Sequence, residues 1–366
     1  MIIKSFLGIR NTSPSRSIPD NALADAVDVD IDDVGIVSRR NGNAIAKSMA
    51  ITSVYSTLDQ VCYVVSGGNL YRLQDNLAEI NLGPSTATYF TDAGKVLFTN
   101  DGLRVEGDVA ASIKLATPSN PLSLSVIAGS LPAGRYSATY TFRNSKGLES
   151  GSAPIATIEL AADGGIDFTP VTPPTGYSVT YYLTDANGEV YRDANGVQLH
   201  SARMLAGPFP GDAELLAWHD SMLFVSRSLP NGSTQLLFSK PYLPQLFDYT
   251  QDYIIVPGQI RGLASTAQAI VIGTDAAIYA WADGSLQTLA GYGVVAGRPF
   301  SRTVDGRVYI FSRRGVCVAF PLENLTEKKA SFAPGQQCST AIVEQNGIQQ
   351  FVVLSDGSGT AYNKRA

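Results

Sequence analysis

The feature that most constrains the fold of this chain is a recurring unit, in which two short apolar runs flank a turn of Gly, Asp or Asn residues. Val, Ile, Tyr, Phe and Thr favour strands and the turn residues favour tight connections, so each unit is typical of a β-hairpin. Six copies occur, at residues 61–73, 95–107, 223–239, 269–281, 307–320 and 350–362. Outside one long interruption they begin about 34 to 46 residues apart, which is the repeat length of blades in a β-propeller. The sequence therefore predicts an all-β fold, a β-propeller of about six blades.

The acidic opening of the chain predicts the strand that closes this ring. Apolar and acidic residues alternate over residues 27–32, the period of a strand with one solvated face. A calcium-binding EF-hand loop beginning at Asp28 would need glycine at position six and glutamate at position twelve, where this chain has Asp33 and Arg39. Because the last hairpin ends near the C-terminus, we expect the strand from Val27 to pair with it, so that N- and C-terminal strands together complete one blade. A disordered acidic arm is the alternative.

The long interruption between the second and third hairpins is interpreted as an inserted domain. Alternating strands are expected at residues 135–142 and 177–184, with turns at 144–147 and at Asn187-Gly188. A length of about 95 residues without a cysteine pair favours an immunoglobulin-like sandwich of the fibronectin III type. The predicted organisation is therefore 1–116 for the first part of the propeller, 117–205 for the insert and 206–366 for the second part.

Composition limits the partners. The 366 residues carry a net charge of -5, which argues against a protein that neutralises DNA phosphates. Three widely spaced cysteines suggest neither a disulfide framework nor a zinc site, and fit synthesis in a reducing cytoplasm. No apolar run reaches the length of a signal-peptide core or a membrane helix, so we expect no membrane anchor.

The sequence offers little for catalysis. Neither His200 nor His219 lies in a catalytic motif, and the signatures of hydrolases, nucleotide triphosphatases and dehydrogenases are absent. His219 is followed by Asp220, but without a nucleophile motif a structural histidine is the favoured interpretation. We therefore expect a protein that is not an enzyme, with no catalytic, cofactor-binding or metal-binding residues and no cofactor. Paired carboxylates of a propeller glycosidase leave no local spacing to recognise, so that possibility stays open.

The segment FSKPYLPQLFDYT (238–250) is unusual because four aromatic residues and two prolines crowd a stretch that reads as too irregular for a strand. One interpretation is a connection between blades that is pinned into the core. The other is a contact surface for a neighbouring subunit, since Tyr and Phe supply large rigid contact areas. The candidate subunit-contact residues are Phe238, Tyr242, Phe247 and Tyr249. The basic pairs at 39–40, 313–314 and 328–329 are interpreted as solvated turns.

Two parts of the chain resemble a known family. The opening FLGIRNTSPSRSIPDNALADAVDVDIDDVGIVSRRNG resembles the N-termini of phage virion proteins, in which a strand leads to a turn supplied here by Asp33, Gly35, Arg39 and Gly42. Asn41 stands where that family often has proline. FSKPYLPQLFDYT, IIVPGQIRGLASTAQAIVIGTDAAIYAW and YGVVAGRPFSRTVDGRVYIFSRRGV are similar to the propeller of tail nozzle, tail hub or tail stabilisation proteins of short-tailed phages (podoviruses).

The resemblance implies a structural virion protein, made in the bacterial host cytoplasm and located in the phage tail. It implies a homohexameric ring, a nozzle or hub around the DNA exit channel, attached to adaptor or portal-side tail proteins and to tail fibres or a needle during genome ejection. Genomic double-stranded DNA would pass through without specific binding, in agreement with the acidic charge. The alternative is a receptor- or glycan-binding tail-tip protein, with the insert as the adhesion module.

Overall fold

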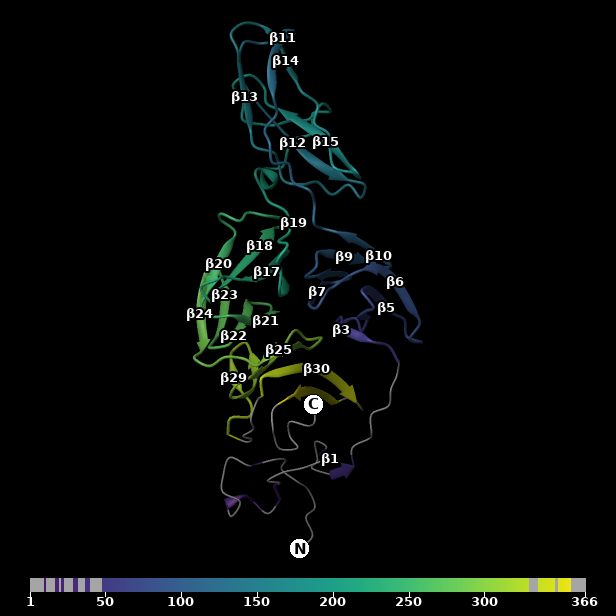
Figure 1. The fold of residues 1–366 in the computed structure, drawn as a ribbon. Helices are drawn as coiled ribbons and strands as arrows, with labels where there is room; N and C mark the ends of the chain where they lie inside the picture. The colour runs from purple at the N-terminus through teal and green to yellow at the C-terminus, as the bar shows by residue number, and fades with distance from the viewer. Residues whose placement is uncertain are drawn as a thin grey trace.

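The computed structural model describes residues 10, 17–19, 21–22, 29–31, 37–39, 48–328, 335–345 and 348–356. Within these residues the regular structure is built from strands, together with a short 3-10 helix, η2 (Ser201–Arg203). The predicted all-β class is confirmed. Figure 1 shows a large lower part and a narrower upper part that projects from it between β10 and β19.

The lower part, here called the body, contains six sheets that follow one another along the chain. Each of the first five sheets is a meander, in which consecutive strands pair with one another, and in the third sheet β20 also pairs with β18. In the sixth sheet, β25 pairs in parallel with β30 of the β30–β31 hairpin. The first sheet contains β3 (Ile51–Ser56), β4 (Cys62–Ser66), β5 (Asn69–Leu73) and β6 (Glu79–Pro84). The second contains β7 (Phe90–Ala93), β8 (Val96–Thr99), β9 (Leu103–Glu106) and β10 (Val109–Ser112). The third contains β16 (Leu216–His219), β17 (Met222–Ser228), β18 (Thr234–Lys240), β19 (Leu243–Phe247) and β20 (Tyr253–Val256). The fourth contains β21 (Ile260–Ser265), β22 (Ile270–Thr274), β23 (Ile278–Ala282) and β24 (Ser285–Ala290). The fifth contains β26 (Phe300–Arg302), β27 (Val308–Ser312), β28 (Gly315–Ala319) and β29 (Glu323–Asn324), and the sixth contains β25 (Ala296–Arg298), β30 (Gln337–Gln345) and β31 (Ile348–Ser355).

Five of the six predicted hairpins are confirmed with both strands, as β4–β5, β8–β9, β17–β18, β22–β23 and β27–β28. Of the sixth hairpin, the first strand is confirmed, because the run from residue 350 lies in β31, which also pairs with the preceding strand β30. The predicted return strand, at residues 359–362, lies outside the described residues.

Successive sheets of the body pack on one another through hydrophobic clusters. Five clusters link the six sheets in chain order, and each draws buried side chains from two neighbouring sheets. Phe98 and Leu223 join the second sheet to the third, for example, and Phe224 and Ile272 join the third to the fourth. Alternate side chains of a strand point to opposite faces, which lets an inner sheet contribute to two clusters at once. The body is therefore a series of sheets stacked face to face.

The strand expected near Val27 is present, but it pairs differently from the prediction. β1 (Val29–Ile31) pairs with β2 (Val37–Arg39) in a sheet of its own, with Val29 opposite Arg39. Among the described pairings, the third strand of the sixth sheet is β25, not a strand from the N-terminus. A hairpin partner a few residues away costs little chain entropy to reach, whereas the predicted pairing joins opposite ends of the chain. Asp28 and Asp32, the other positions of the rejected calcium loop, lie outside the described residues.

The upper part contains the strands of residues 117–205, here called the insert. They form two sheets: β11 (Leu124–Leu131) with β14 (Gly164–Phe168), and β12 (Gly134–Asn144) between β13 (Ala156–Leu160) and β15 (Tyr177–Leu183). β12 and β15 confirm the two strands expected from the sequence, and the turns at Gly147 and Asn187 are also found. A separate hydrophobic cluster that includes Tyr140, Phe142 and Phe168 fills this part. The insert therefore has a core of its own.

The chain leaves and re-enters the body at well-defined points. Ile113 is fully buried in the cluster between the second and third sheets. On the return, Gly207 exchanges two backbone hydrogen bonds with Phe247 at 2.7 and 3.0 Å. Both anchors lie outside residues 117–205, so the insert can be removed without cutting either.

We expect the body to remain folded when residues 117–205 are replaced by a short Gly-Ser linker. Loop-closure entropy changes slowly with length, so the body should lose no more than about 1 kcal/mol of unfolding free energy. The measurement is the urea unfolding curve of the shortened chain beside that of the full chain. Loss of a cooperative transition would mean that the insert supplies part of the body's core.

Candidate functional site

One hollow of the body lies where four strands end. β7, β16, β21 and β26, here called the central strands, each open one of the second to fifth sheets. Their last residues line a pocket of about 790 Å³, here called the large pocket, together with the loop after β21 and the β23–β24 turn. Residues at or just before the starts of β7, β16 and β21 line a smaller pocket of about 300 Å³. Of the central strands, β7, β16 and β21 therefore run in the same direction between the two pockets.

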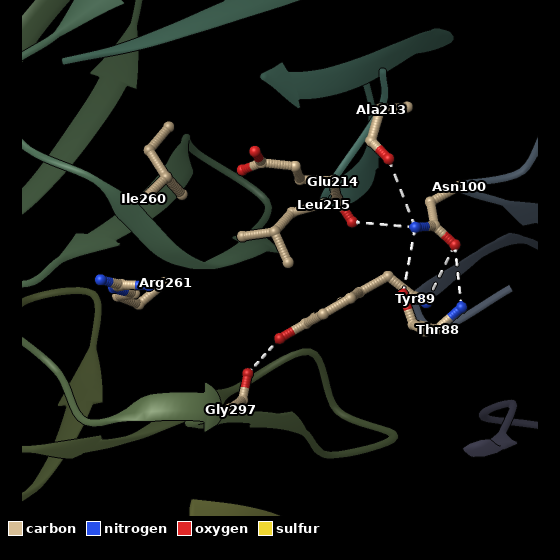
Figure 2. Close-up of a pocket in the computed structure, with 9 residues that line it drawn as sticks. All are labelled: Thr88, Tyr89, Asn100, Ala213, Glu214, Leu215, Ile260, Arg261 and Gly297. Carbon is tan, nitrogen blue, oxygen red and sulfur yellow. Dashed lines mark hydrogen bonds between the residues drawn. The ribbon is translucent and has the colours of Figure 1, made fainter. Parts of the chain in front are cut away.

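Hydrogen bonds between its own walls occupy much of the small pocket (Figure 2). The Asn100 side chain donates to the carbonyl oxygens of Ala213 and Glu214, each at 3.3 Å, and accepts from the backbone N–H groups of Thr88 and Tyr89. The Tyr89 hydroxyl donates to the Gly297 carbonyl on the opposite wall. Burial raises the pKa of Tyr89, so this hydroxyl keeps its proton. The small pocket thus holds the second, third and sixth sheets together.

The floor of the large pocket is an ion pair that joins three sheets. Asp92, at 8% exposure, accepts a hydrogen bond from the Tyr55 hydroxyl through Oδ1. Its Oδ2 lies 3.5 Å from Nη2 of Arg302. Burial, followed by the charge of Asp92, raises the pKa of Tyr55 above its usual range. Strands from the first, second and fifth sheets therefore meet at one neutralised carboxylate.

His219 lies on the wall of the same pocket. Its Nδ1 shares a hydrogen bond of 2.9 Å with Oγ of Ser265, at the end of β21. Burial lowers the pKa of His219, opposed by the negative charge of Asp220, so the imidazole is neutral at pH 7. Asp220 is exposed in the β16–β17 turn. The hydrogen-bonded partner of His219 is therefore Ser265, which no local motif could have indicated.

The structure does not bring the four candidate contact residues onto one surface. Phe247 is fully buried in the cluster between the second and third sheets, and Phe238 packs against Phe224 and Trp281. Tyr249 is half-buried and donates through its hydroxyl to the Pro208 carbonyl at 2.8 Å. Tyr242 is 80% exposed. Of the four, Tyr242 offers the largest free side chain.

The segment 238–250 was wrongly expected to be too irregular for a strand. It consists of the end of β18, a tight turn at Pro241-Tyr242, β19, and the beginning of the turn that follows Phe247. The proline within β19 is tolerated because the pairing register of β18 with β19 shifts between Ser239 and Lys240, which interrupts the regular hydrogen-bond ladder.

The turn places Tyr242 in the left-handed region, with φ at 60°. Proline followed by a residue of positive φ is the pattern of a type II turn, where glycine or asparagine is usual. The Tyr242 N–H donates to the Ser221 carbonyl at 2.9 Å, so the turn lies beside the β16–β17 turn. A bulky exposed aromatic side chain is therefore held in a conformation that costs free energy.

The turn interpretation of the basic pairs holds for Arg313 and Arg314, which connect β27 to β28. The guanidinium of Arg314 lies 4.9 Å from the centre of the Tyr292 ring. Arg39 lies in β2, and residues 40 and 329 lie outside the described part.

Among the described residues, no group of three His, Cys, Asp or Glu side chains is placed to hold a metal ion. In the same part of the chain no helix has the length and apolar character needed to cross a membrane.

The chain was compared with known proteins. No family model matches it, and no curated protein matches it. Among solved structures, one described as the extracellular domain of a hybrid two component system of B. thetaiotaomicron is 10% identical, with a TM-score of 0.31, and the alignment covers 85% of this chain and 38% of that one. PorZ, a surface component of the type-IX secretion system of Porphyromonas gingivalis, is 10% identical with a TM-score of 0.29, over 87% of this chain and 39% of that one. A puromycin hydrolase is 13% identical with a TM-score of 0.31, over 85% and 51%. The chain thus spans less than two thirds of each of these proteins, and likenesses this distant assign it neither a fold nor an activity.

Proposed function

We propose that this chain is a structural subunit of a bacteriophage tail, located in the virion. In this proposal the body is a β-propeller of about six blades that carries an immunoglobulin- or fibronectin III-like insert. Six copies form the nozzle or hub, a ring around the DNA exit channel, attached to adaptor or portal-side tail proteins and to tail fibres or a needle. The protein acts by assembly and not by catalysis.

The sheet arrangement supports the propeller. Six sheets stacked in chain order, five of them meanders of consecutive strands, are the components of such a ring. The shared direction of β7, β16 and β21 suits an arrangement around one axis. Arg298, in the sixth sheet, donates to the carbonyls of Val54 in the first sheet and Thr88 beside the second, which supports closure between the two ends of the series.

Contacts near that axis indicate where DNA would pass. Arg302 reaches Asp92, and Tyr89 reaches Gly297, so the second sheet is tied to the fifth and the sixth. In a ring of six blades the second and fifth lie opposite one another, and these contacts obstruct the middle of the propeller. We therefore infer that the exit channel is formed between subunits. The net charge of -5 fits a channel that does not hold DNA.

Tyr242 is the observation that carries the assembly proposal. Its side chain is 80% exposed, and its backbone adopts the unfavourable left-handed conformation at φ 60°. That backbone conformation costs free energy in the isolated chain, whereas exposed tyrosines are favoured as anchors of protein interfaces. We infer that Tyr242 contacts a neighbouring subunit of the ring.

Replacing Tyr242 with glycine separates assembly from folding. Glycine accepts positive φ without strain, so the variant should be as stable as the natural chain, or more stable by up to about 1 kcal/mol. Its ring should dissociate at concentrations where the natural chain remains hexameric. The measurements are native mass spectrometry of both proteins over a dilution series and a melting curve of each.

Leu77→Gly is the matched control, because Leu77 also has positive φ, at 61°, and lies in the β5–β6 turn. The control should keep the ring. A natural chain that is monomeric at every concentration would contradict the proposed function, and an unchanged hexamer in Tyr242→Gly would remove Tyr242 from the interface.

A further inference from the structure

The large pocket has the size of a small-ligand site, and half of the residues that line it are polar or charged. Its volume of about 790 Å³ lies within the range of roughly 300–1,000 Å³ usual for such sites. Two indole rings, Trp218 and Trp281, line it together with polar side chains. Trp218 is held by stacking on Phe98, with ring centres 5.3 Å apart. The aromatic part of the wall is therefore preorganised.

The charges on the floor of the pocket cancel. The Asp92 carboxylate is matched by Arg302 and also accepts from Tyr55. The Arg302 guanidinium donates no other hydrogen bond to a described residue, and Arg302 lines the pocket. His219 is neutral at pH 7 because burial lowers its pKa. The floor thus offers hydrogen-bond donors and acceptors without an unpaired charge.

The rim of the pocket is acidic. Asp220 and Asp283 are both exposed and occupy two-residue hairpin turns, between β16 and β17 and between β23 and β24. Their positive φ values, 46° and 49°, suit such turns. An anionic ligand, including a nucleic acid, would meet two carboxylates before reaching a floor that has no free cation. The charge distribution therefore disfavours phosphates and acidic sugars.

We propose that the large pocket binds a neutral oligosaccharide. Each sugar hydroxyl both donates and accepts hydrogen bonds, which matches Arg302, Ser265 and the exposed amide of Gln268 on this wall. The C–H face of a pyranose ring is apolar and can pack on an indole. This activity is separate from ring assembly, because the site is complete within one chain. It gives the protein a sugar-binding function in addition to its proposed structural role.

The test is direct binding of three neutral probes, maltotriose, cellotriose and chitotriose, to the full-length chain by saturation-transfer difference NMR. Each is titrated to about 10 mM, which covers the millimolar dissociation constants expected for weak ligands. Sialyllactose and spermidine serve as anionic and cationic comparison probes. At least one neutral probe should give saturable signals, and the two charged probes should give none.

Two small substitutions locate the site. Ser265→Ala removes the hydroxyl opposite His219, and Gln268→Ala removes an exposed amide, so neither should disturb the fold. Each should weaken binding by up to about tenfold, equivalent to the loss of one hydrogen bond to a neutral ligand. Ser56→Ala, an exposed serine on β3 away from the pocket lining, is the control and should bind as the natural chain does. Absence of binding by all three neutral probes, binding of a charged probe alone, or binding unchanged in both pocket variants would each overturn the proposal.

Discussion

Replacing Glu149 with alanine is expected to lower the unfolding free energy of the insert by about 3–5 kcal/mol. Glu149 is only 5% exposed and lies 3.2 Å from Nη2 of Arg143 and 3.4 Å from Nη1 of Arg203. Oε1 also accepts hydrogen bonds from the Thr141 and Tyr182 hydroxyls, at 2.5 and 2.6 Å. Truncation would leave the buried Thr141 and Tyr182 hydroxyls without an acceptor and would remove the carboxylate from both guanidinium groups, which costs more than the net stability of the intact network.

The same network fastens the segment that leads back to the body. Arg203 donates to the Glu149 carbonyl at 3.0 Å, and its own carbonyl accepts from the Ser152 N–H at 2.7 Å. The Cβ of any residue replacing Gly151 would lie 1.7 Å from the Ala206 carbonyl oxygen, so the backbones are in direct contact here. Loss of Glu149 should therefore loosen this connection as well as the insert.

The measurement is differential scanning calorimetry of the full chain, with Glu159→Ala as the control. Glu159 lies on β13 with an exposed side chain, so its removal should change little. A Glu149→Ala transition within the error of the control would show that the buried carboxylate contributes no net stability.

Glu149 should also make the insert sensitive to acid. Burial alone would raise the pKa of this carboxyl, but the hydrogen bonds from Thr141 and Tyr182 and the two arginines outweigh it and lower the pKa. A carboxyl with a lowered pKa in the folded state stabilises that state above its unfolded pKa, near 4.3. This contribution disappears as the pH falls further, through the folded pKa, and Glu149→Gln should remove that part of the pH dependence.

The hairpins of the body could be predicted from the sequence because the residues that specify each hairpin are close together in the chain. In residues 269–281, for example, both strands and the turn lie within one short window, and the structure forms β22 and β23 there. The N-terminal strand shows the limit of this reasoning. Its alternation predicts a strand correctly at residues 29–31, but it does not say which edge the strand joins, and β2 takes it.

The site could not be predicted, because its parts come together only after the sheets have stacked. Asp92 and Arg302 are 210 residues apart, and His219 and Ser265 are 46 residues apart. The sequence signal was weak: His219, Ser265 and Arg302 each end a short strand, and Asp92 is the last residue but one of another. The prediction for segment 238–250 was wrong for a different reason, because both interpretations treated its aromatic residues as one set. Strand alternation and the turn instead place Phe247 in the core and Tyr242 in solvent.

Replacing Asp92 with alanine is expected to destabilise the body by about 3–5 kcal/mol, because it would leave Arg302 and the Tyr55 hydroxyl without their acceptor at the junction of three sheets. The urea midpoint of the shortened chain, without the insert, reports on the body alone. Glu106→Ala, which breaks a surface pair with Arg104 at 2.7 Å, is the control and should have little effect.

The triple variant Tyr55→Phe, Asp92→Leu, Arg302→Met distinguishes the cost of losing one partner from the net contribution of the whole cluster to the unfolding free energy. A buried ion pair pays a large desolvation cost, so an apolar replacement of all its members at similar volume is often neutral. We therefore expect the triple variant to recover most of the stability lost in Asp92→Ala. If it remains as unstable as the single variant, the ion pair itself holds the second and fifth sheets together. Recovery would mean that stability does not require these polar groups, and would leave ligand binding in the large pocket as the reason for a charged floor.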